Sequence, residues 1–209
     1  MIGTLLSLLL LATGGPAAGA AGPPLPPYPL ALRSFEVHYR VTGTRRGTET
    51  LAVVDSGAVL LVHIHDTLRD GSVVDSLRVV TPTGGYQIVN GDTLPLSIGW
   101  AFVERFLHFK LWNSLATGEP PAEGALFEKI GQEKILGHPC TTYNTFYLRR
   151  NTQISGYQGI PLLFVWVDST DTGPVVNEKR AVYLKLRPTT LQDPALQAAR
   201  ALLRKSSRP

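Results

Sequence analysis

The chain has 209 residues, a formal net charge of +4 and a single cysteine, Cys140. A lone cysteine excludes an intramolecular disulfide, and a chain of this length suits one domain. Four basic residues and one acidic residue lie between Asp193 and Pro209, so the rest of the chain is close to neutral. The sequence contains no concentrated basic stripe, and we therefore expect no nucleic-acid partner.

The first residues of the chain are typical of an export signal. Leu5–Leu11 form an apolar run that is too short to span a bilayer, and Ala18-Gly19-Ala20 follows as a cleavage site. The proline-rich stretch after it is typical of an extended spacer. We therefore predict a signal peptide over 1–20, a spacer over 21–33 and a single β-rich domain over 34–205. The protein is then expected in the periplasm or outside the cell.

A series of short strands follows the spacer. The alternation with polar residues that marks a half-buried strand begins with Phe35, Val37, Tyr39 and Val41. Turn-forming sequences then recur at roughly regular intervals, at Gly43–Gly47, Asp55-Ser56-Gly57, Asp70-Gly71, Thr83-Gly84-Gly85 and Asn90-Gly91. This spacing predicts an antiparallel meander rather than strands that alternate with helices.

The segment Ser97–Leu115 interrupts the meander. Its apolar residues lie at helical spacings but cover most of the circumference, so a helix here needs burial on several sides. A curved sheet provides that burial. We predict a mainly β fold of eight to ten strands, a curved antiparallel sheet or an unclosed β-barrel, with this apolar helix on its concave face.

Strands resume after the helix and a short helix closes the chain. The predicted strands are Leu126–Leu136, Cys140–Leu148, Ile160–Asp168 and Arg180–Arg187. Both alternating faces of Leu162–Val167 are apolar, so one face can meet a core while the other needs a helix or a ligand. Asp193 and Pro194 are typical of a helix start. The short C-terminal helix that they predict has an apolar stripe of Leu196, Ala199 and Leu203.

The aromatic residues of the predicted helix exceed what one packing face needs. Curved β-structures either fill their interior or hold a ligand in it, so two interpretations stay open. In the first, the protein is a structural or interaction module of the cell envelope with a filled core. In the second, it binds an apolar or acyl ligand, a lipid for example, in a half-barrel cavity. The expected cavity walls are Trp100, Phe102, Phe106, Phe109, Phe164 and Trp166.

The sequence offers little support for catalysis or metal binding. His63 and His65 share one face of a strand, and His38 would have to join them, but two histidines on a solvent face are the simpler interpretation. Cys140 lies beside His138 but opens a strand, where no helix dipole lowers a thiol pKa. Serine-hydrolase, P-loop and dinucleotide-binding motifs are absent. We expect a non-enzymatic protein without catalytic residues, metal or cofactor.

One segment carries a family resemblance. Gly131–Tyr143 has the pattern Gly-x-Glu-x-Ile-x-Gly-x-x-Cys-x-x-Tyr, and Gly159-Ile160-Pro161-Leu162 and Val165–Asp168 follow it. With these residues the chain resembles exported bacterial proteins of the lipoprotein-carrier (Lol) type over Ser34–Arg187. The resemblance implies an unclosed antiparallel β-barrel around a helix, with a cavity that accepts lipoprotein acyl chains in the carriers. In this chain the proline-rich spacer replaces the N-terminal helix of those carriers. The sequence does not indicate a protein partner.

Overall fold

The computed structural model describes residues 34–54, 59–81, 84–90, 92–96, 98–147 and 150–186; for 81, 84 and 98–106 it describes the backbone only. The predicted signal peptide, the spacer, the Asp55-Ser56-Gly57 turn and the short C-terminal helix lie outside the described residues. Among the residues described, no helix combines the length and the hydrophobicity of a membrane span.

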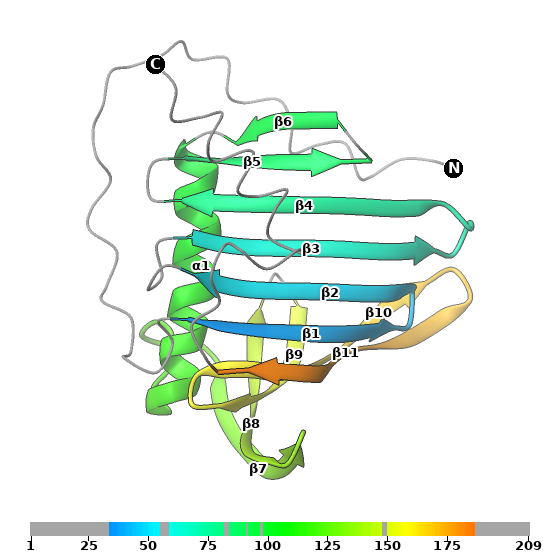
Figure 1. Cartoon of the computed structure of the whole chain (residues 1–209). Helices are drawn as coiled ribbons and strands as arrows, with labels where there is room; N and C mark the ends of the chain where they lie inside the picture. The colour runs from blue at the N-terminus through cyan, green and yellow to red at the C-terminus, as the bar shows by residue number, and fades with distance from the viewer. Residues whose placement is uncertain are drawn as a thin grey trace.

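Eleven strands in the described ranges form one antiparallel sheet. Six precede the helix α1 (Ile98–Thr117): β1 (Phe35–Thr42), β2 (Arg45–Val54), β3 (Val59–Leu68), β4 (Val73–Thr81), β5 (Gly84–Val89) and β6 (Asp92–Leu96). Five follow it: β7 (Phe127–Ile135), β8 (His138–Tyr147), β9 (Arg150–Tyr157), β10 (Ile160–Thr170) and β11 (Gly173–Lys185). Their spatial order is β6-β5-β4-β3-β2-β1-β11-β10-β9-β8-β7 (Figure 1). The edge strands β6 and β7 do not pair with each other, so the sheet is open.

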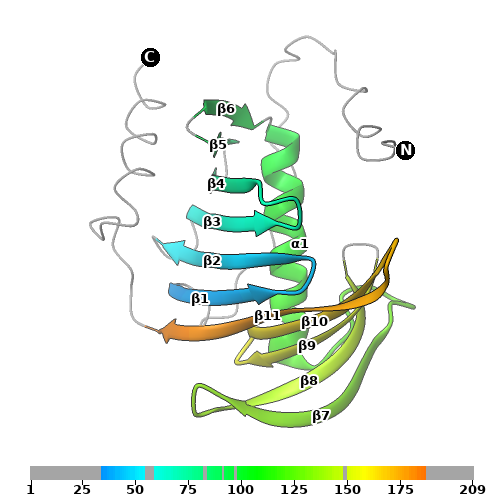
Figure 2. The same cartoon turned by 90° about the vertical axis from the view of Figure 1, so that its right-hand side faces the viewer.

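The first and the last strand meet in the middle of the sheet. β1 pairs with β11, which places Glu36 opposite Lys185. On one side of this junction β1–β6 form a ladder, and on the other side β7–β9 curve away from it (Figure 2). Because α1 contacts β4 and β5 of the ladder as well as β9 and β10, it lies in the concavity between the two parts. The predicted fold class, a curved antiparallel sheet with a helix on its concave face, is confirmed.

The number of strands was predicted too low. Eleven strands are present in the described residues instead of eight to ten, and β9 was missed altogether. β9 has the sequence Arg-Asn-Thr-Gln-Ile-Ser-Gly-Tyr, in which Ile154 is the one aliphatic side chain. Such a segment has too few apolar residues for an alternation to stand out. It becomes a strand because β8 and β10 pair with it on both sides.

Two of the predicted turns are shorter than expected. Between β1 and β2 only Gly43 and Thr44 turn, whereas Gly47 lies inside β2. A Cβ atom at Gly47 would lie 2.0 Å from the carbonyl oxygen of His65, so close contact with β3 explains this glycine. Gly84 and Gly85, predicted as part of a turn, begin β5. The turn at Asp70-Gly71 is present, between β3 and β4.

α1 crosses the strands on one face of the sheet (Figures 1 and 2), and it ends with a glycine cap. Its bounds differ by one and two residues from the predicted Ser97–Leu115. Gly118 follows the helix with φ of +80°, and its N–H donates to the carbonyl oxygen of Ser114 at 2.8 Å. A left-handed residue at this position is a common helix stop that glycine adopts without strain.

The core forms where α1 meets the concave face. Trp112 is only 1% exposed. Its ring and that of Phe35 meet edge to face, with their centroids 5.3 Å apart. Phe109 packs on the same indole at 5.4 Å. Next to them Leu115 lies against Gly156 of β9, where a Cβ would approach the leucine carbons to 3.1 Å. The helix therefore packs tightly on the strands, and much of the apolar surplus of its C-terminal half is structural.

Candidate functional site

An open pocket of about 810 Å³ lies over β8, β9 and β10. Val165 pairs with Gln153, and Gln153 pairs with Asn144, so these pocket residues share one face of the sheet. The adjacent Phe164 belongs to the core under α1, and side chains alternate along a strand, so Val165 and Val167 project to the face opposite to Phe164. The residues of the pocket, called the groove below, are Leu126, Glu128, Asn144, Thr145, Phe146, Arg150, Asn151, Thr152, Gln153, Val165, Trp166, Val167 and Val176.

The groove exposes large apolar side chains. Phe146 is 59% exposed, Val167 56% and Val176 63%, and Leu126 is exposed beside them. Single exposed apolar residues are common on soluble proteins, whereas a group of them around a hollow marks a binding surface. This surface accounts for the second apolar face of Leu162–Val167 that the sequence left without a partner.

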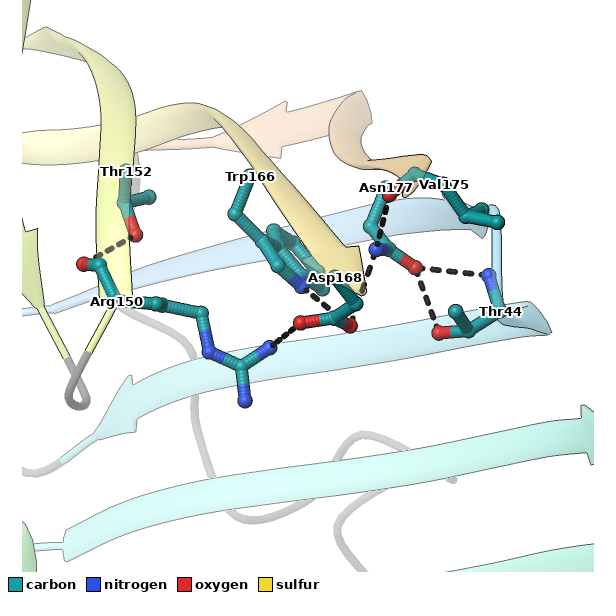
Figure 3. Close-up of polar contacts among 7 residues, drawn as sticks. All are labelled: Thr44, Arg150, Thr152, Trp166, Asp168, Val175 and Asn177. Atoms are coloured by element: carbon teal, nitrogen blue, oxygen red, sulfur yellow. Dashed lines mark hydrogen bonds and ion pairs between the residues drawn. The ribbon is translucent and has the colours of Figure 1, made fainter. Parts of the chain in front are cut away.

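Two groove residues, Arg150 and Trp166, share one carboxylate partner, Asp168, which does not itself line the groove (Figure 3). An Nη1–H of Arg150 donates to Oδ1 of Asp168 at 3.0 Å, and the indole N–H of Trp166 donates to Oδ2 at 3.1 Å. The guanidinium carbon of Arg150 lies 5.7 Å from the centre of the Trp166 ring. One carboxylate thus fixes the orientation of both a cation and an aromatic ring.

A buried asparagine holds this carboxylate from the other side (Figure 3). Asn177 is fully buried, and its Nδ2 donates to Asp168 Oδ2 and to the carbonyl oxygen of Val175, both at 3.1 Å. Its Oδ1 accepts from the backbone N–H and the hydroxyl of Thr44, at 2.8 and 2.7 Å. The β1–β2 turn is thereby tied to β10 and β11, which holds Asp168, and with it Arg150 and Trp166, in place.

The predicted cavity walls fall into two sets. Phe109 and Phe164 are buried in the core cluster, and Trp166 packs against that cluster and is also one of the groove residues. Trp100, Phe102 and Phe106 lie on α1 by their backbone, and their side chains are outside the described ones. The structure therefore brings Phe109, Phe164 and Trp166 into one cluster.

A buried ion pair that the sequence did not reveal lies on the concave face. Lys179 Nζ is 2.7 Å from Glu49 Oε1, and the side chains are 16% and 8% exposed. The ammonium also lies over two rings, 4.3 Å from the centre of Phe164 and 4.8 Å from that of Tyr39. The Tyr39 hydroxyl donates to the carbonyl oxygen of Pro161 at 2.7 Å. Burial, followed by the negative charge of Glu49, raises the pKa of Tyr39 well above its ordinary value.

A second pair lies next to it. Arg45 Nη1 is 2.6 Å from Oδ2 of Asp66, whose side chain is almost fully buried. Burial raises the pKa of Asp66, while the positive charge of Arg45 opposes that rise. One signal for these pairs was present in the sequence, because Glu49 occupies a core-facing position in the alternation of β2 with Leu51 and Val53. Its partner could not be found, because Lys179 is 130 residues away in the chain.

His108 of α1 is stacked on Trp112, with ring centroids 5.4 Å apart. Burial, followed by the charge of Lys179, lowers the pKa of His108 to about 4. A histidine of the unfolded chain titrates near 6.5, so from about pH 6.5 down to about pH 4 the unfolded state binds a proton that the folded state does not. The contribution of the neutral His108 to the free energy of unfolding is therefore fully present above about pH 6.5 and is lost as the pH falls through about 4.

Substitution of this histidine is expected to flatten the acid side of the stability profile. Between about pH 7 and pH 4, His108→Gln should lose less free energy of unfolding than the wild type, by up to about 3 kcal/mol. Urea unfolding at several pH values measures the difference, and the carboxylates common to both chains cancel in it. Parallel profiles for the two proteins would show that His108 is not held neutral by the fold.

The remaining candidates from the sequence do not assemble into a metal centre or a nucleophile. His63 Nε2 lies 2.8 Å from Asp75, and His38 instead contacts Glu36 of its own strand. In the part of the chain that the structure describes, no group of three or more His, Cys, Asp or Glu is placed to hold a metal ion. Cys140 is buried, and this burial raises the pKa of its thiol, which disfavours the thiolate that a nucleophile requires.

Comparisons with known proteins give weak similarities of structure. No family model matches the chain, and no curated protein is significantly similar to it. A structure of MucB in complex with MucA(peri) has a TM-score of 0.37 and 18% identity over 79% of this chain and 56% of that chain. The complex of Pseudomonas aeruginosa MucA/MucB gives 0.39 and 14%, over 74% and 53%. PNGF-II gives 0.36 and 12%, over 78% and 29%. The chain spans about half the length of the MucB chains, and at these TM-scores the similarity does not indicate what it binds.

Proposed function

We propose that the chain is an exported, non-enzymatic binding protein of the cell envelope, and that its ligand is an apolar or acyl compound. The observation that carries this proposal is the groove, where Phe146, Val167 and Val176 are more than half exposed around one hollow. Such exposure costs free energy in water, and a ligand that covers these side chains would recover it. The predicted signal peptide supports export to the periplasm or beyond.

The chemistry of the groove favours a ligand with an apolar chain and one acidic end. Its volume lies in the range of small-molecule sites, and its apolar side chains are accompanied by a few polar groups. Arg150 is 44% exposed at one end and is held in place by Asp168. Its side chain projects to the side of Trp166, so a carboxylate or phosphate head group would meet this pre-oriented cation at the strand ends, while the chain lies along Val165 and Val167. A fatty acid has this composition.

The concave interior is the second place where such a ligand would bind. The cavity walls predicted there are the aromatic residues of α1, Trp100, Phe102, Phe106 and Phe109, together with Phe164 and Trp166. The resemblance to lipoprotein carriers supports an acyl chain in this interior. Trp166 belongs to both places, because it packs on the core and lines the groove. The alternative function, an interaction module with a filled interior, is favoured by the burial of Phe109 and Phe164.

Binding of a fluorescent fatty acid to matched valine variants tests the proposal. Val167→Glu places a carboxylate among the apolar groove residues, and we expect at least about tenfold weaker binding because the charge would have to be desolvated. Val182→Glu is the control: Val182 lies on β11, is 48% exposed against 56% for Val167, and does not line the groove. This control should bind as the wild type does.

Two results would contradict the proposal. If the wild-type protein shows no saturable binding of fatty acids, the interaction module becomes the better account. If Val167→Glu and Val182→Glu bind equally well, the ligand does not occupy the groove.

A further inference from the structure

A second, smaller hydrophobic cluster lies apart from the core under α1. Its residues are between 0% and 6% exposed and come from the ends of three neighbouring strands: Ala52, Val54, Val59, Leu61 and Val79. Leu77 packs against them. We refer to this group as the outer cluster. It is independent of the groove and of the function proposed above.

The outer cluster faces away from α1. Val53 belongs to the core that contains Trp112, so its neighbours Ala52 and Val54 point to the opposite side of β2. Ala52 pairs with Leu61, and Leu61 pairs with Val79, which places these side chains in one row across the sheet. In Figures 1 and 2, α1 lies on one face of β1–β6, and no other element of the described part covers the other face.

Side chains on a sheet face that nothing covers are exposed to solvent, and part of the face that carries the outer cluster is exposed in this way. His63 and His65 follow Leu61 on that side of β3, and their side chains are 49% and 56% exposed. Yet a few residues away Leu61 and Ala52 are almost completely buried. The cover is therefore local. It has to come from a part of the chain outside the described ranges.

The C-terminal segment begins in the same row of paired residues as the outer cluster. β11 ends at Lys185, which pairs with Glu36, and Glu36 pairs with Ala52. The row Lys185, Glu36, Ala52, Leu61, Val79 thus runs from the end of β11 into the outer cluster. Four strand spacings separate β11 from β4, which is about 19 Å. A helix over 193–205 would be about 20 Å long, enough to cross the same strands.

We propose that residues 193–205 form an amphipathic helix that docks on the outer cluster. The stripe of Leu196, Ala199 and Leu203 is narrow and contains a small residue, which suits a surface of alanine and valine. Arg200 flanks this stripe, four residues after Leu196, and Arg204 lies farther round the helix, so both long side chains would extend from the edge of the contact into solvent. The proline-rich spacer over 21–33 has no helical stripe of this kind. The strands β1–β4 then lie between two helices, one on each face.

Thiol labelling of a reporter cysteine tests the docking. In the full-length mature chain carrying Cys140→Ala, Ala52→Cys adds one small atom inside the outer cluster. We expect slow maleimide labelling, accelerated at least about tenfold when Leu196→Asp and Leu203→Asp disrupt the stripe. Gln197→Asp, on the other side of the helix, should leave the rate unchanged. A second reporter, Val53→Cys, faces the core and should remain protected in every variant, which separates undocking from unfolding.

Three outcomes would overturn the proposal. The rate at Ala52→Cys could be the same with and without the stripe substitutions. Deletion of residues 21–33 could accelerate labelling instead, which would assign the cover to the spacer. Protection could disappear on dilution, which would assign it to a second copy of the chain. If Ala52→Cys does not fold, Val79→Cys reports on the same cluster with the same three outcomes.

Discussion

Replacement of Trp112 by alanine is expected to lower the free energy of unfolding by about 3–5 kcal/mol. The indole is 1% exposed and contacts the rings of Phe35, His108 and Phe109. Its removal leaves a cavity at the point where α1 meets β1, and packed neighbours relax only partly into such a space. Urea unfolding followed by far-UV circular dichroism measures the loss.

A neighbouring residue of the same helix provides the control. Leu107 is 40% exposed, and Leu107→Ala should cost less than about 1 kcal/mol because most of the side chain is already in water. If Trp112→Ala costs no more than this control, α1 is not held in the concavity of the sheet, and the packing described here is wrong.

Removal of one partner from the ion pair between Lys179 and Glu49 is expected to be the second large effect. Lys179→Met should cost about 3–5 kcal/mol at neutral pH, because it leaves the Glu49 carboxylate buried without its closest cation. Arg45 cannot replace that cation, since its nearest nitrogen is 4.0 Å from Glu49 and it already pairs with Asp66. Chemical unfolding at constant ionic strength gives the value.

The double variant separates the pair from its environment. Lys179→Met combined with Glu49→Leu removes both charges and should recover most of the stability that either single substitution loses, since apolar replacements of a buried pair are often neutral. Losses that simply add would indicate that the two side chains do not interact. They would also imply that solvent reaches Glu49 in the folded state.

The sequence allowed much of the architecture to be predicted, because local patterns decide it. The alternation of Phe35, Val37 and Tyr39 predicted β1, and the all-round apolar character of 97–115 predicted α1 on a concave face. β9 was missed since its polar side chains carry no alternation, and its conformation is imposed by β8 and β10.

The candidate site was predicted only in part, and distance along the chain explains why. The apolar outward face of Val165 and Val167 was visible in the sequence, and it is one wall of the groove. The neighbouring part of the groove comes from Phe146 and Asn144 on the same face of the sheet, which only strand pairing brings near. Likewise, the support of Asp168 comes from Asn177 and Thr44, and Thr44 lies at the other end of the domain sequence. Pairings of this kind leave no local signal.

Titration of the valine methyl groups with a medium-chain fatty acid, followed by NMR, tests the central claim that the exposed groove binds an apolar ligand. We predict saturable shifts at Val165, Val167 and Val176, while Val37 and Val53 in the core remain unchanged. Shifts restricted to the core valines would place the ligand in the concave interior. The absence of any shift at saturating fatty acid would contradict the proposed function itself.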